Sequence, residues 1–168
     1  DYSPREAVFA ARDRCDETVD HMRSVRTGDF KYIRNFLPNR PYLQPCAYKD
    51  AKAILIAIRE SHKTGTLNEI QQLVMREVRP KEELYEINND PHEINNLADD
   101  PAFAGKLKQL RGRLDTWMDE THDSVPADIS RDSFDRKTGQ RLKGVKDYRR
   151  TTPGEDRQAD QTNAPGPR

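Results

Sequence analysis

The sequence predicts an α+β fold: a small antiparallel sheet with helices packed on one face, ending in a long amphipathic helix. Three observations predict it, namely several short strand-like segments, a hairpin turn between two of them, and a helix with a single apolar stripe. The expected strands lie near residues 7–11, 22–27, 30–36 and 83–87. Each apolar face has to be buried against another element, so a two-layer arrangement follows.

The expected hairpin runs from Met22 to Phe36. Polar and apolar residues alternate on both sides of Gly28-Asp29, which can supply the turn. Basic and aromatic residues are interleaved in its second strand, a pattern that also occurs in single-strand nucleic-acid platforms. The chain has 29 basic and 29 acidic residues and no net charge, so we prefer an ordinary amphipathic hairpin and expect no nucleic-acid partner.

A charged segment follows the first expected strand. The apolar run Ala7–Ala11 suits a buried strand and ends abruptly in Arg12–Glu17, where five of six residues are charged. Such a segment is either a solvated turn or the polar wall of a pocket. The residues themselves leave both interpretations open.

The middle of the chain is expected to be helical. Three prolines within Leu37–Pro45 indicate an extended connector, and a helix is predicted over Tyr48–His62. A second helix is predicted to begin at Thr66, which can form a capping box with Glu69. The apolar residues of both helices are expected to be core: Ala51, Ile54, Leu55 and Ile58 in the first, and Leu67, Ile70, Leu73 and Val74 in the second.

The long helix is preceded by a strand and a polar turn. Residues 83–87 (ELYEI) suit the strand, and Asn88–Pro91 suits the turn. Asp100 suits the N-cap because its carboxylate accepts backbone N–H groups, and Pro101 suits the first helical position. The helix Pro101–Thr121 carries one apolar stripe, made of Phe103, Leu107, Leu110, Leu114, Trp117 and Met118.

Two regions are expected, a folded subdomain over residues 1–123 and an extended, largely disordered tail over residues 124–168. Large apolar residues are thinly spread after Asp123 and absent from Thr151 onward. Such a segment buries too little apolar surface to offset an ordering entropy of about 1–2 kcal/mol per residue. No apolar run reaches the roughly 18 residues of a membrane-spanning helix, so no membrane span is expected.

Three separated blocks carry a family resemblance. They are Arg12–Glu17, Val25–Phe36 and Glu83–Pro101 (ELYEINNDPHEINNLADDP), the last followed by an amphipathic helix with a Trp. In this order they resemble the C-terminal subdomain of sulfatases of the alkaline phosphatase superfamily, above all heparan N-sulfatase (sulfamidase) and related arylsulfatases. The resemblance covers roughly Ala7 to Asp123. It implies a fragment whose catalytic N-terminal part is missing, from a bacterial parent that is exported or periplasmic.

The resemblance also implies that the parent uses calcium and a formylglycine, which is made from Cys or Ser within a C/S-x-P-x-R pattern. Neither Cys15 nor Cys46 is followed by that pattern, and the acidic and Asp-Asn pairs that bind calcium in the family are absent. We therefore expect no cofactor in this chain. We expect two buried or free thiols, and no hydrolysis of sulfate esters by the chain alone.

In proteins that this chain resembles, the segment matching Arg12–Arg23 approaches the mouth of the active site. Arginine suits an anionic sulfated glycan there, because its planar fork makes bidentate, charge-assisted hydrogen bonds to sulfate or carboxylate. The residues that the resemblance implies as substrate contacts are Arg12, Asp13, Arg14, Asp16, Glu17 and His21.

The function implied is structural support and part of the substrate pocket of a sulfuric ester or sulfamate hydrolase. Its partners are then the missing N-terminal catalytic domain and a sulfated glycan or other sulfate ester; N-sulfated glucosamine, O-sulfated sugars and aryl sulfates all stay open. The alternative is an independent carbohydrate- or anion-binding module without catalysis. The first hypothesis also predicts an exposed apolar surface where the fragment docks against the catalytic domain.

Overall fold

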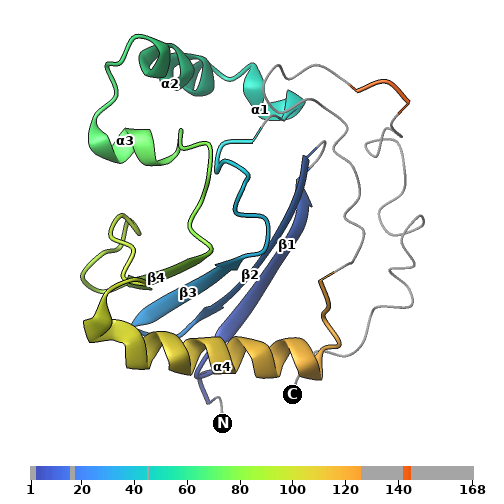
Figure 1. Cartoon of the computed structure of the whole chain (residues 1–168), viewed down its shortest axis with the longest axis vertical. Helices are drawn as coiled ribbons and strands as arrows, with labels where there is room; N and C mark the ends of the chain where they lie inside the picture. Colours follow the sequence, from blue (N-terminus) through green and yellow to red (C-terminus); the bar gives the residue numbers. More distant parts are fainter. Residues whose placement is uncertain (1–2, 16–17, 45, 126–141, 145–168) are drawn as a thin grey trace.

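The computed structural model describes residues 3–15, 18–44, 46–125 and 142–144. Within them, four strands form one antiparallel sheet in the order β1-β2-β3-β4, so each strand pairs with the next along the chain (Figure 1). The strands are β1 (Val8–Cys15), β2 (Thr18–Arg26), β3 (Phe30–Asn35) and β4 (Glu82–Glu86). The predicted fold class is confirmed. The predicted tail lies almost entirely outside the described residues.

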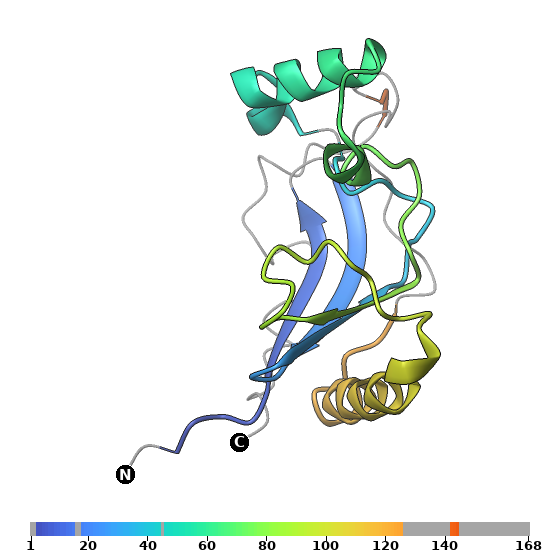
Figure 2. The same cartoon turned by 90° about the vertical axis from the view of Figure 1, so that its left-hand side faces the viewer.

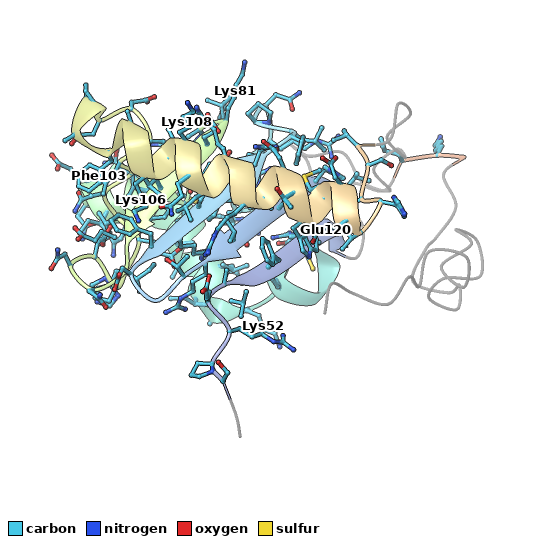
Figure 3. All side chains as sticks on the ribbon, turned by 90° about the horizontal axis from the view of Figure 1, so that it is seen from below. Lys52, Lys81, Phe103, Lys106, Lys108 and Glu120 are labelled. Carbon is cyan, nitrogen blue, oxygen red and sulfur yellow. The ribbon has the colours of Figure 1, made fainter. Side chains whose placement is uncertain are left out.

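The helices divide into two groups. The helical elements are α1 (Ala47–Asp50), α2 (Ala53–Lys63), α3 (Glu69–Leu73), the short 3-10 turn η1 (Pro101–Phe103) and α4 (Ala104–Glu120). Of these, α4 lies across one face of the sheet, near the end where β1 begins (Figures 1 and 3). By contrast, α1, α2 and α3 lie beyond the other end of the sheet (Figures 1 and 2). The two groups therefore have different packing environments.

The core lies between the sheet and α4. Val25, Tyr32 and Leu84 are paired in register across three strands, and all three are fully buried. The buried residues that α4 contributes are Leu107, Leu110, Leu114 and Met118. Burying one such leucine contributes about 1.5–3 kcal/mol to folding. The apolar stripe predicted for the long helix is confirmed.

The start of the long helix also matches its prediction. The Asp100 side chain accepts a hydrogen bond from the backbone N–H of Ala102 at 2.9 Å, and Pro101 occupies the first helical position. At the other end of the stripe, the rings of Phe9 and Trp117 stack with centroids 5.2 Å apart. This contact joins β1 to α4.

The side chain of Asn96 makes hydrogen bonds to the outer edge of β4 that a neighbouring strand would otherwise make. Asn96 accepts a hydrogen bond from the Leu84 backbone N–H at 2.9 Å and donates to the Glu82 carbonyl at 3.0 Å. Next to it, the Leu97 N–H donates to the Leu84 carbonyl at 2.8 Å. These bonds satisfy the edge of β4, which would otherwise present unpaired backbone groups.

The prediction that the residues of α2 and α3 are core is wrong. Neither helix contains a buried residue. Ile54 in α2 is 72% exposed and Ile70 in α3 is 54% exposed, although Leu67, just before α3, is buried. The physical reason is position: these helices lie beyond the sheet, so the sheet and α4 do not bury their apolar side chains.

Two local details of this region also differ from the prediction. The predicted helix over Tyr48–His62 is divided into α1 and α2, because Lys52 adopts an extended backbone conformation with ψ 135°. The capping box is formed by Asn68 and Gln71, whose reciprocal hydrogen bonds measure 2.9 and 3.0 Å. Thr66 instead donates to the Ser61 carbonyl at 3.3 Å, so α3 begins later than the predicted Thr66 box.

Candidate functional site

The predicted site residues lie where β1 and β2 meet at the end of the sheet nearest α1 (Figure 1). The strand β1 extends to Cys15, so Arg12–Cys15 is strand, while Asp16 and Glu17 lie outside the described residues. Arg12 pairs with Met22 and Arg14 with Val19, so one residue of β1, Asp13, lies opposite two residues of β2, Asp20 and His21, and the irregularity is in β2. The contacts place Asp20 and His21 on different faces of the sheet, because Asp20 meets Arg12 and His21 meets Asp13, the next residue of β1.

On one face, Asp20 is the centre of a buried polar cluster. Its carboxylate accepts two hydrogen bonds from Arg79, at 2.6 and 3.0 Å, and one from the Gln44 side chain at 2.9 Å. The Asp20 side chain is 0% exposed and the Arg79 side chain 1% exposed. Arg12 completes the cluster, with its Nε 3.8 Å from an Asp20 carboxylate oxygen and its side chain 40% exposed.

On the opposite face, Asp13 joins two buried side chains. It accepts hydrogen bonds from His21 Nδ1 and Arg23 Nη1, both at 2.8 Å. Burial raises the pKa of Asp13, but the hydrogen bonds and positive charges of His21 and Arg23 outweigh it and lower the pKa to about 2. The carboxylate therefore stays ionised through the whole physiological range.

Arg23 continues this arrangement toward α4. Its guanidinium also binds the carboxylate of Asp123, just beyond the end of α4, through two of its nitrogens. Burial lowers the pKa of Arg23, yet its bonds to Asp123 and Asp13 raise it overall. The network thus ties the C-terminal end of the long helix to the end of the sheet that carries the predicted site.

Three nitrogen atoms in this region are buried without a hydrogen-bond partner among the described residues: Arg12 Nε, His21 Nε2 and Arg79 Nε. Buried polar atoms are normally satisfied, so each of these is unusual. His21 has its Nδ1 fixed by Asp13, and its ring meets the edge of Phe36 with centroids 4.8 Å apart. The orientation of the imidazole is therefore fixed while Nε2 remains unsatisfied within the described part of the chain.

The structure brings together two of the six predicted contact residues, Asp13 and His21, whereas Arg12 lies with Asp20 on the opposite face of the sheet. Arg14 lies on β1, and Asp16 and Glu17 fall outside the described residues. Sequence reasoning missed the two residues that organise the first cluster, Asp20 and Arg79. Neither residue belongs to a recognisable motif, and because they lie 59 positions apart no local sequence pattern predicts their contact.

The described residues offer no catalytic metal centre. No group of three or more His, Cys, Asp and Glu side chains among them could hold a metal ion. Cys46 is buried. The site is therefore an array of hydrogen-bond donors and carboxylates, suited to orienting a polar ligand.

The nucleic-acid alternative for the hairpin is contradicted by its side chains. Tyr32 is fully buried beneath α4 and has no exposed face on which a base could stack. Lys31 pairs with Glu93 at 2.7 Å, and Arg34 pairs with Asp115 at 2.6 Å. The basic and aromatic residues of β3 hold the fold together.

Fold and site together define a small α+β subdomain with an ionic cluster at one end of its sheet. The chain is 40% identical over 114 residues to an ulvan-active sulfatase of Formosa agariphila, covering 68% of this chain and 19% of that protein. It is 32% identical over 124 residues to the N-sulphoglucosamine sulphohydrolase of Homo sapiens, covering 69% of this chain and 23% of that protein. The chain belongs to the sulfatases and corresponds to a C-terminal segment of them.

The chain spans about a fifth of the length of the curated relatives it matches. No protein-family model matches it. A solved 2-O GAG sulfatase aligns with 76% of this chain and 20% of its own, at 20% identity and a TM-score of 0.45. None of the described helices is long and apolar enough to cross a membrane.

Proposed function

We propose that this chain supports the catalytic part of a sulfatase acting on a sulfated sugar and forms one side of its substrate pocket. The names of two relatives support this substrate class: one is an ulvan-active sulfatase and the other an N-sulphoglucosamine sulphohydrolase. In this proposal residues 1–123 are the subdomain and residues 124–168 a tail. The catalytic N-terminal part lies outside these 168 residues.

The observation that carries the pocket role is the setting of Arg12. Its Nε is buried 3.8 Å from the carboxylate of Asp20, which Arg79 fixes in turn, yet the Arg12 side chain is 40% exposed. An arginine held in this way can donate charge-assisted hydrogen bonds to a sulfate oxygen with little loss of side-chain entropy. Asp13, 55% exposed, lies on the opposite face of the sheet with His21 and Arg23, so the pocket role rests on Arg12.

The residues present do not fit the calcium and formylglycine that the family implies. Neither Cys15 nor Cys46 lies in a C-x-P-x-R pattern, and the described residues contain no cluster of metal ligands. No step of hydrolysis is therefore assigned to this chain. Its contribution is to bind and orient substrate, and the reaction itself belongs to the rest of the parent enzyme.

A chimera tests the proposal. This chain replaces the matching segment of the Formosa agariphila sulfatase, and desulfation of ulvan is measured. The chimera is expected to be active, and Arg12→Ala is expected to lower kcat/KM about 10- to 100-fold, the effect of losing a charge-assisted hydrogen bond. Arg26→Ala is the matched control, because Arg26 is an exposed arginine at the far end of the same strand pair.

Two outcomes would overturn the proposal. A folded chimera in which Arg12→Ala and Arg26→Ala behave alike would remove the pocket role. Sulfate release from ulvan by the isolated chain with added calcium would contradict the assignment of catalysis to the missing part. Specific binding of ulvan by the isolated chain at both low and high salt, with no effect in the chimera, would instead favour the independent binding module.

A further inference from the structure

We propose that the exposed aliphatic side chains of α2, α3 and the segment after them are the surface on which the rest of the parent sulfatase docks. The inference rests on the proposed function and adds the location of the interface. We call this region the α2–α3 surface. It consists of Ile54, Ile56, Ile70, Val74 and Val78.

The exposure of these residues is the first argument. Their exposed fractions are 72%, 56%, 54%, 41% and 61% in chain order, and they make up five of the eight exposed large apolar residues in the described part of the chain. The 11-residue helix α2 begins AILIAI yet buries none of its residues. A helix this short is marginal in water by itself, and its stability normally comes from packing an apolar face. The exposed apolar side chains of α2 therefore need a partner.

A groove next to α3 gives the surface its shape. It has a volume of about 510 Å³ and lies between α3 and the loop that carries Ile94. Apolar side chains of Ile70, Leu73 and Met75 line it together with the charged Glu69 and Arg76. Mixed apolar and charged lining is typical of a protein interface, with an apolar centre and a polar rim.

Two facts identify the partner that docks on the α2–α3 surface: the length of the relatives and the place of this surface on the sheet. The relatives are about five times as long as their matching segments, so most of a sulfatase lies outside this chain. The α2–α3 surface lies at the same end of the sheet as the C-terminal end of β1 (Figure 1). Docking there brings the catalytic part next to Arg12 and Asp13, as the pocket role requires, whereas docking on the outer side of α4 would not.

The residues after Asp123 could also cover the α2–α3 surface, but their sequence is poorly suited to it. The last 18 residues, from Thr151 on, contain no large apolar side chain. The apolar residues between Ser124 and Thr151 are few and widely spaced. An apolar surface of five aliphatic residues is better covered by another apolar surface than by this sequence.

The experiment uses the same chimera and the isolated 168-residue chain, and it measures soluble yield and thermal unfolding instead of activity. Ile54→Glu and Ile70→Glu are compared with Val8→Glu, which changes an exposed valine at the other end of the sheet, 49% exposed. In the isolated chain all three variants are expected to unfold at the wild-type temperature. In the chimera, the two isoleucine variants are expected to lower the soluble yield about tenfold or more, since they bury a carboxylate in an interface centre.

Each other outcome counts against the inference. Equal yields for all three chimeric variants would exclude this surface, and unfolding of the isolated chain by Ile54→Glu would make α2 part of its own core. A dimer of the isolated chain that Ile54→Glu dissociates, with an unaffected chimera, would assign the surface to a second copy. If the unmodified chimera does not fold, the same changes are made at the aligned positions of the intact Formosa agariphila enzyme. Failure of the pocket role alone would leave these yields unchanged and would alter only the Arg12→Ala kinetics.

Discussion

Arg79 and Asp20 lie 59 positions apart in the sequence and form a bidentate ion pair, with nitrogen–oxygen distances of 2.6 and 3.0 Å. Between β3 and β4 the chain leaves the sheet, and this ion pair lies where that segment returns to it. At the same point the Arg79 N–H donates to the Pro38 carbonyl at 2.8 Å, and the Asn35 N–H donates to the Lys81 carbonyl at 2.9 Å. The whole region between β3 and β4, with α1, α2 and α3, is thus anchored by its two ends.

Arg79→Ala is expected to destabilise the fold by about 3–5 kcal/mol, because it leaves the buried carboxylate of Asp20 without its main positive partner. The measurement is urea unfolding followed by circular dichroism. Lys63→Ala serves as the control, since Lys63 and Glu60 form an ion pair whose side chains are 72% and 65% exposed. The control is expected to change stability by no more than about 0.5 kcal/mol. Equal effects of the two substitutions would contradict an anchoring role.

The lowered pKa of Asp13 predicts that the folded state loses stability in acid. The folded state lowers its pKa from 3.8 to about 2, so its stabilising contribution is complete above pH 3.8 and is lost as the pH falls through 2. The melting temperature of Asp13→Asn is expected to lie below that of the wild type at pH 5, with the difference shrinking as the pH falls from 3.8 toward 2. Asp99→Asn, which changes an exposed aspartate before the long helix, is the control. A difference that stays constant with pH would rule out this linkage.

The sheet and the long helix could be predicted because their signals are local. Alternation predicted the hairpin that carries Val25 and Tyr32, and the helical spacing from Leu107 to Met118 identified the buried face of α4. Asp100 and Pro101 fixed the start of that helix through their own backbone preferences. Each of these inferences needs only a few neighbouring residues.

The α2 prediction failed for an informative physical reason. The spacing of Ile54 and Ile58 shows that one face of the helix favours burial, but it does not say against what. In the described structure α2 lies beyond the sheet, so Ile54 is exposed and Ile58 is only partly buried. The Asp20 cluster was missed for a related reason, since no periodicity links a residue of β2 to Arg79.

The raised pKa of Tyr32 predicts that the folded state loses stability in alkali. Burial and a hydrogen bond to Glu82 raise its pKa from 10.0 to about 12. Its contribution is therefore complete below pH 10.0 and declines as the pH rises through about 12. Tyr32→Phe removes the ionisable group but keeps the ring, so the melting temperature of this variant should fall less between pH 9 and 12 than that of the wild type. At neutral pH the loss of the hydrogen bond should cost about 0.5–1.5 kcal/mol. A wild-type slope in the variant would contradict the assignment.

Asn96→Ala tests whether one side chain completes the sheet. The asparagine satisfies the N–H of Leu84 and the carbonyl of Glu82, and it also accepts from the Ala98 N–H at 3.0 Å. Removing it leaves partly buried backbone groups without a partner, so a loss of about 1–3 kcal/mol is expected. The Leu84 amide should exchange with solvent faster, while Val25, on a central strand, should keep its protection under conditions where exchange is local. Asn95→Ala is the control, because Asn95 is exposed and its backbone N–H donates to the Asp90 carboxylate at 2.8 Å, with no side-chain hydrogen bond to another described residue. If Leu84 exchanges at the same rate in both variants, the edge of β4 is held by the backbone of Leu97 alone.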